Sequence, residues 1–83
     1  MNAQVHDDPT ILVVATINEV LAETGHPSQS LTDDTVILAD TPLDSMGLAL
    51  VVVRLEEVTG IDPFEDGFIN FRTVGELAAL YAH

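Results

Sequence analysis

The amino-acid sequence predicts an all-α domain built as a small helical bundle. Apolar residues recur at helical spacing in three separate segments, and each segment is bounded by residues that favour a helix start or end. No pair of segments has the alternating pattern of two paired strands. With 83 residues, the chain has room for one domain with a modest core. We expect residues 1–8 to form a flexible tail and residues 9–83 a single domain.

The first helix is predicted over residues 9–24. Asp8 suits its N-cap, Pro9 suits its first position, and Gly25 suits a left-handed C-cap. The apolar residues between these ends have helical spacing, so we expect them to face the core. They are Ile11, Val14, Ile17, Val20 and Leu21.

A long connection follows at residues 26–44. Connections of more than about 12–15 residues are uncommon in compact domains and are usually functional where they occur. A short helical turn can begin after Thr32 and Asp33. The apolar residues expected to attach this connection to the core are Leu31, Val36, Leu38 and Leu43.

The second main helix is predicted to begin at Asp44 and Ser45 and to end before Gly60. It carries two apolar stripes, each with helical spacing. The stripe expected to face the core consists of Leu48, Val51, Val52, Leu55 and Val58. The other consists of Met46, Ala49, Leu50 and Val53. One stripe is enough to attach a surface helix to its core, so the other meets a further helix or a partner protein.

The last main helix begins at a capping box formed by Thr73 and Glu76, and continues through Leu77, Leu80 and Tyr81. Residues 61–72 before it are irregular and can hold one short helix. The predicted architecture is therefore three main helices plus one short helix, with the long loop between the first two main helices.

The chain is strongly acidic. Arg54 and Arg72 are its only basic residues against 14 acidic ones, for a formal net charge of −12. Nucleic acids and anionic membrane surfaces are bound through Lys and Arg, so the charge argues against both. It favours partners with basic docking patches, or it serves only solubility. No apolar run approaches the roughly 18 residues of a membrane helix, and the N-terminus lacks a secretory signal, so we expect a cytoplasmic location.

The sequence offers little catalytic or metal-binding chemistry. Cysteine is absent, and the three histidines, His6, His26 and His83, lack the spacing of a triad or a metal site. Residues 62–73 match an EF-hand loop in part, but Phe64 and Thr73 replace two of its ligands. We therefore expect no metal site and no catalytic residues of its own.

Ser45 is the one residue that suggests chemistry, in the stretch LDSMGL. A serine at a helix start can act as an N-cap. Its hydroxyl can also carry a phosphate, because free backbone N–H groups and the positive end of the helix dipole favour an anion there. Local physics alone favours the capping interpretation.

The wider pattern resembles the acyl carrier proteins, over about residues 11–81. The pattern is Asp-Ser-Met at a helix start, then Leu-Glu-Glu at 55–57, Gly-Ile at 60–61, and Thr-Val-Gly-Glu-Leu at 73–77. The resemblance implies an acyl-carrier-like four-helix bundle with residues 9–83 as the carrier domain. It also implies that a phosphopantetheinyl transferase, using Mg²⁺, transfers 4′-phosphopantetheine from coenzyme A to Ser45. The thiol of that group would hold cargo as a thioester.

The resemblance further implies which proteins the chain meets. They are the phosphopantetheinyl transferase, a loading enzyme for acyl or aminoacyl groups, and a ketosynthase, transferase or thioesterase of the pathway. The carrier itself is expected to be a monomer. The second main helix would be the recognition helix. The residues implied as partner contacts are Asp44, Met46, Leu50, Val53, Glu56 and Glu57.

Several residues depart from the family pattern. Pro42 stands where a glycine is usual, Leu50 stands where an acidic residue is common, and Arg54 adds a positive charge. Residues 61–72 are unusually aromatic. These departures favour a free-standing carrier of polyketide or other specialised metabolism. The alternatives are an aminoacyl or peptidyl carrier, and an acidic helical module such as a nucleic-acid mimic or adaptor, in which Ser45 only caps a helix.

Overall fold

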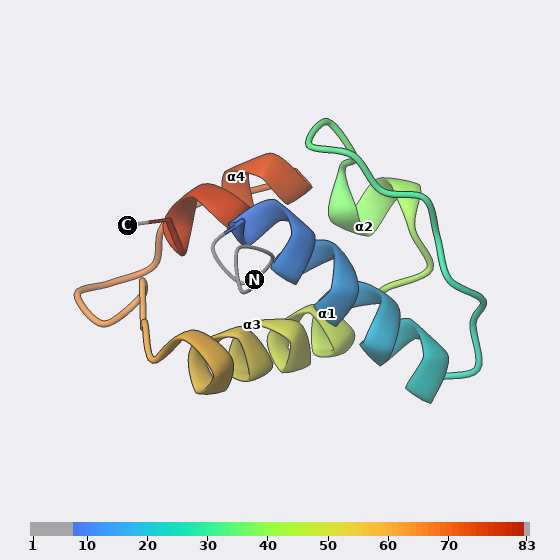
Figure 1. Ribbon diagram of the computed structural model, residues 1–83, viewed down its shortest axis with the longest axis horizontal. Helices are drawn as coiled ribbons and strands as arrows, with labels where there is room; N and C mark the ends of the chain where they lie inside the picture. The colour runs from blue at the N-terminus through green and yellow to red at the C-terminus, as the bar shows by residue number, and fades with distance from the viewer. Residues whose placement is uncertain (1–7, 83) are drawn as a thin grey trace, which may run out of the picture.

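The computed structural model describes residues 8–82 and is built from four helices (Figure 1). These are α1 (Pro9–Glu23), α2 (Ile37–Asp40), α3 (Ser45–Thr59) and α4 (Val74–Leu80). Strand pairing over residues 8–82 is limited to one isolated bridge, so the prediction of an all-α bundle is confirmed. None of the helices in this range is long and apolar enough to cross a membrane. Most of the predicted tail lies outside the described residues.

The three longer helices enclose the hydrophobic core. In Figure 1, α1 crosses between α3 and α4, and it packs against both. The fully buried side chains come from one face of each of these helices, with Ile37 added by α2. The largest are Val13, Ile17, Val20, Leu21, Ile37, Val51, Leu55, Val74 and Leu77.

The helix ends follow the predicted capping chemistry. The Asp8 carboxylate accepts the Thr10 N–H at 2.9 Å and caps α1. α3 ends at Gly60, which has a φ of +72° that favours glycine. Thr73 and Glu76 form the predicted capping box of α4. The three main helices therefore begin and end within a residue of the predicted positions.

Three residues expected to face the core are exposed instead. Ile11, Leu38 and Val58 are 47%, 49% and 65% exposed, so this part of the prediction was wrong. In α1, the fully buried Val13 stands nearest the core at this end of the helix. In the connection, the short helix turns Ile37 toward the core and leaves Leu38 exposed.

Val58 is exposed because α1 and α3 do not close against each other near the end of α3. A groove of about 390 Å³ remains between the two helices, and Leu12, Ala15 and Val58 are among the residues that line it. The last turn of the core-facing stripe therefore borders an open groove.

The short helix lies in the long connection, at Ile37–Asp40. The alternative position within residues 61–72 was wrong, because that segment contains only turns and bends. Pro63 begins a turn there, and Gly67 has a φ of +133°, which interrupts any helix. The connection itself is not loose, since backbone hydrogen bonds attach it to the start of α4.

Those hydrogen bonds pair residues 33–37 with residues 72–75. Ile37 N–H donates to the Arg72 carbonyl at 2.9 Å, and the N–H groups of Val74 and Gly75 donate to carbonyls of the connection at the same distance. A Cβ on Gly75 would lie 3.1 Å from the Asp33 carbonyl oxygen, so this close approach favours glycine. The connection and α4 thus hold each other in place.

Arg54 connects α3 to α1. Its guanidinium forms ion pairs at 2.6 Å with Glu19 and with Glu23. In the sequence, Arg54 departs from the family pattern by adding a positive charge. The structure shows that carboxylates of α1 match this charge.

Replacing Arg54 with glutamine is expected to lower the free energy of unfolding, measured by urea titration. The guanidinium hydrogen bond lowers the pKa of Glu23 from its ordinary value of 4.5. The stabilisation is therefore present above that value and is lost as the pH falls through the lowered pKa. Salt should reduce the difference between wild type and variant, because both carboxylates are solvent-exposed.

Arg72→Gln is the matched control, since it removes the same charge from a residue that makes no ion pair within residues 8–82. Equal losses of stability in the two variants would contradict the assignment of the α1–α3 contact to Arg54.

Candidate functional site

At the N-terminus of α3, the structure distinguishes the role of Asp44 from that of Ser45, which local sequence preferences alone could not do. Asp44 is the N-cap, and its carboxylate accepts the Gly47 N–H at 2.7 Å. Ser45 is the first residue of the helix and is exposed. Asp44 performs the capping, so the interpretation of Ser45 as only a cap was wrong.

The surroundings of Ser45 suit a phosphate ester. The first amides of an α-helix have no acceptor within the helix, and the Asp44 carboxylate occupies only that of Gly47. The N–H groups of Ser45 and Met46 are left to face solvent or a ligand. The dipole of this 15-residue helix adds positive potential at the same end. An exposed hydroxyl here can bear a phosphorylated group without disturbing the core.

The loop before Ser45 is fixed by its own contacts. Leu43 is buried beneath the first turn of α3, where a Cβ on Gly47 would lie only 2.7 Å from its Cδ1. Glycine at this position therefore lets Leu43 pack closely against the helix. The Thr41 hydroxyl donates to the Ile37 carbonyl at 2.6 Å and accepts the Leu43 N–H at 3.1 Å. These contacts attach the loop to α2 and hold Ser45 at the surface.

The sequence analysis predicted that the second apolar stripe of α3 meets either a further helix or a partner protein. In the structure this stripe lies outside the core, as contact with a partner protein would require. Met46, Leu50 and Val53 are 81%, 38% and 49% exposed, and Ala49 is exposed with them. The stripe starts beside Ser45 and follows the helix. All six residues predicted as partner contacts, Asp44, Met46, Leu50, Val53, Glu56 and Glu57, are exposed on α3 or its cap. Their binding of partners stays a prediction.

Around the end of α3, three residues form an acidic and phenolic cluster that the sequence did not reveal. The negative charge of Asp62 raises the pKa of Glu56, with burial adding to the effect. Tyr81 is buried, and its hydroxyl has no hydrogen-bond partner within residues 8–82. Burial, followed by the charges of Glu56 and Asp62, raises the pKa of Tyr81 to about 12. No sequence signal marked this cluster, because it depends on how residues 61–73 fold back.

Replacing Tyr81 with phenylalanine is expected to protect the fold at alkaline pH. The folded-state pKa is raised from 10.0, so stability is intact below that pH and is lost as the pH rises from about 10 through 12. Tyr81→Phe removes the group that titrates. Unfolding curves in urea at a series of alkaline pH values would measure the difference.

At neutral pH the same variant is expected to be as stable as wild type or more stable, because removing the hydroxyl breaks no hydrogen bond within residues 8–82. A clear loss of stability at neutral pH would contradict an unpartnered hydroxyl. Tyr81 is the only tyrosine and tryptophan is absent, so phenolate absorbance reports this residue directly.

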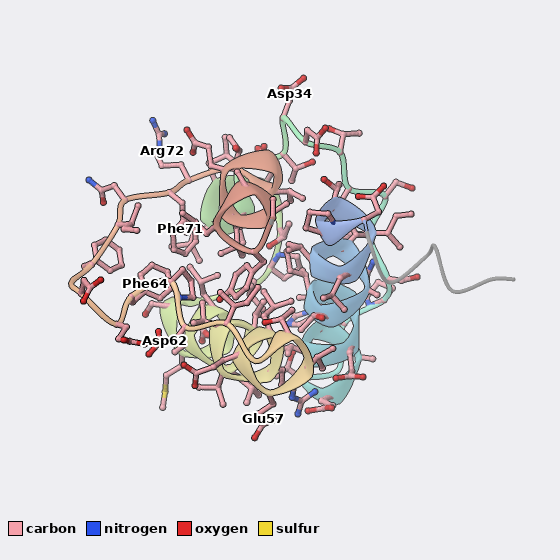
Figure 2. The ribbon with its side chains drawn as sticks, turned by 60° about the vertical axis from the view of Figure 1, so that its left-hand side comes forward. Asp34, Glu57, Asp62, Phe64, Phe71 and Arg72 are labelled. Atoms are coloured by element: carbon pink, nitrogen blue, oxygen red, sulfur yellow. The ribbon has the colours of Figure 1, made fainter. Side chains whose placement is uncertain are left out.

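An aromatic cluster organises the irregular segment before α4. The ring centroids of Phe64 and Phe68 are 5.6 Å apart and stacked, and Phe71 lies 6.0 Å from Phe64 and 6.3 Å from Phe68. In Figure 2 the labelled Phe64 and Phe71 lie on the inner side of the arc formed by this segment. Phe71 packs against the core, and Phe68 is 75% exposed. Aromatic packing thus replaces a helix in shaping residues 61–73.

The acidic residues do not gather into a metal centre. Over residues 8–82, no group of three or more His, Asp or Glu side chains is arranged to hold a metal ion. His26 is exposed just after α1, while His6 and His83 lie outside the described residues.

A comparison with protein families identifies the chain. A family model described as phosphopantetheine attachment site matches residues 12–81, which is most of the chain and includes all four helices apart from the first turn of α1. No curated protein and no solved structure matches the chain.

Proposed function

The chain belongs to the phosphopantetheine attachment site family, and we propose that Ser45 is the residue to which the group is attached. The observation that carries this proposal is the exposed Ser45 hydroxyl at the start of α3, with the capping role filled by Asp44. Members of this family are carriers, and covalent 4′-phosphopantetheine supplies the thiol that holds cargo as a thioester. The chain itself has no cysteine, so the prosthetic group would be its only thiol.

In the attachment step, the Ser45 hydroxyl oxygen forms the new bond to phosphorus. The pyrophosphate P–O bond of coenzyme A breaks, adenosine 3′,5′-bisphosphate leaves, and the hydroxyl proton passes to the transferase. The transferase and Mg²⁺ supply this chemistry. Ser45 contributes the nucleophile, and the amides of the first turn favour the resulting phosphodiester.

The carrier itself would not catalyse reactions on its cargo. Residues 9–83 would form the carrier domain, with residues 1–8 as a tail, acting as a cytoplasmic monomer. The phosphopantetheinyl transferase and the enzymes of the pathway would dock on α3 through the six residues from Asp44 to Glu57 that were predicted as contacts. The acidic surface favours partners with basic patches.

A polyketide or other specialised pathway is the setting we favour. The support is the apolar character of the exposed α3 stripe, where Leu50 replaces an acidic residue, and the aromatic segment with its exposed Phe68. An aminoacyl or peptidyl pathway is the alternative. Equal turnover of this carrier by housekeeping fatty-acid synthase enzymes would contradict a specialised role.

The attachment is tested by incubating the purified chain with coenzyme A, Mg²⁺ and a broad-specificity transferase. The intact mass is expected to rise by one phosphopantetheine group, and fragmentation is expected to place the group on Ser45. A reaction without transferase is the control. No mass gain, or a gain on another residue, would overturn the proposal.

A further inference from the structure

A pocket opens close to Ser45, on the side of α2. It has a volume of about 220 Å³ and lies between α2, α3 and the residues just before α4. Leu48 contributes the α3 wall, three residues after Ser45. Residues three apart on a helix are surface neighbours, with Cβ atoms roughly 5–6 Å apart. A flexible group anchored at Ser45 can therefore fold back into this pocket.

The walls and size of the pocket suit a short hydrocarbon chain. Leu38, Ala39, Leu48 and Phe71 make its lining mainly apolar. Its volume exceeds the roughly 150 Å³ of a cavity that binds benzene and is below the roughly 300–1,000 Å³ of sites for drug-sized ligands.

Arg72 is the one charged residue that lines the pocket. Both ion pairs within residues 8–82 belong to Arg54, and the chain has no lysine. Arg72 is exposed, and Figure 2 shows it projecting from the segment beside Phe71 toward solvent. Arg72 thus lines the pocket while its charged end is at the outer surface, as is usual for long basic side chains.

Two carboxylates of the neighbouring helices are occupied by backbone groups. Asp40 of α2 accepts the Val36 N–H at 2.8 Å. Glu76 of α4 accepts the N–H groups of Arg72 and Thr73 at 2.7 and 3.0 Å. The positive charge of Arg72 contributes to the lowered pKa of Glu76, but the two side chains form no ion pair, so the guanidinium can still bind an anion from outside the chain.

We propose that Arg72 makes this carrier favour a cargo whose far end is anionic, such as a carboxylate, with the apolar part of the cargo in the pocket. This inference rests on the proposed attachment at Ser45. The net charge of −12 repels an anionic cargo over most of the surface. The Arg72 guanidinium, which forms no ion pair within residues 8–82, lies beside an apolar pocket and is the place where such a cargo gains an opposite charge.

The test compares two cargoes of matched length on the full chain. The carrier is loaded from octanoyl-coenzyme A and from the coenzyme A half-thioester of the eight-carbon dicarboxylic acid, and cleavage of each thioester by hydroxylamine is timed. Each rate is divided by the rate for the same thioester on free coenzyme A. We expect the carboxylated cargo to be cleaved about threefold more slowly than octanoyl cargo, as for one exposed ion pair, and the ratio to approach one in high salt.

Arg72→Gln is expected to abolish this preference, and Arg72→Lys to retain part of it. Arg54→Gln is the charge-matched control and should leave it unchanged, since Arg54 does not line this pocket. A preference of equal size in wild type and Arg72→Gln, or no preference in wild type, would overturn the inference. The mass gain on loading would still uphold attachment at Ser45 in that case. Failure of loading would overturn both.

Discussion

Replacing Ser45 with alanine is expected to abolish the mass gain with coenzyme A and transferase completely. Alanine has no oxygen to bond to phosphorus, and the Thr73 hydroxyl, at the start of α4, accepts the Glu76 N–H in a capping box. The free energy of unfolding should change by no more than about 0.5 kcal/mol, because the substitution is at an exposed position and Asp44 caps the helix. Intact mass and urea unfolding of the same preparation measure both.

Asp44→Ala is the matched control, with the reverse expectation. It removes the carboxylate that accepts the Gly47 N–H, so the free energy of unfolding should fall by about 1 kcal/mol. Its Ser45 hydroxyl is retained, so the variant should still reach full loading at long incubation times. Loading of Ser45→Ala, or a loss of stability in Ser45→Ala equal to that of Asp44→Ala, would contradict this division of roles.

Replacing Met46 with alanine is expected to lower kcat/KM of the transferase for this carrier about tenfold. Met46 is an apolar side chain, 81% exposed, and it is adjacent to the serine that must enter the active site of the partner. Central apolar contacts of an interface commonly contribute more than 1 kcal/mol, and 1.4 kcal/mol corresponds to a factor of ten. Initial rates over a range of carrier concentrations give the value.

Val58→Ala controls for loss of an exposed apolar side chain from the same helix. Val58 is 65% exposed, but it lines the groove between α1 and α3, about four turns from Ser45. The rate should remain within about twofold of wild type, as for a residue outside the contact area. Equal effects of the two substitutions would show that exposed apolar surface in general, and not the stripe beginning at Met46, promotes docking.

The helix ends were predictable because capping is chemistry between neighbours in the sequence. Backbone groups at the helix starts are satisfied within a few residues by Asp8 and by the Thr73 and Glu76 pair. Pro9 suits the first position of α1, and Gly60 ends α3. The orientation of α1 was less predictable. Ile11 and Val13 are both apolar, and the packing of α3 and α4 decides which of them is buried.

The remaining errors involve contacts between distant segments. The position of the short helix depends on the pairing of residues 33–37 with residues 72–75, which leaves no local pattern. The same is true of the Arg54 ion pairs with α1 and of the cluster of Glu56, Asp62 and Tyr81. Propensity and periodicity describe single segments, so they contain no information about such partners.

The sequence also predicts a candidate site at Ser45, for a reason that includes more than local physics. Capping preferences alone could not distinguish Asp44 from Ser45, since both suit a helix start. The wider family pattern favours Ser45 as the attachment residue, which stays a prediction. The structure adds that Asp44 holds the cap and that Arg72 lines a pocket one turn from the serine.

The pairing of the long connection with the start of α4 bears on how the domain opens. The amides of Ile37, Val74 and Gly75 are protected only while both segments are in place, because each donates across the pair. Hydrogen exchange should therefore release these three amides at one common rate, as a single cooperative unit. The loop that leads to Ser45 would then be as persistent as the last helix, despite having only four helical residues of its own.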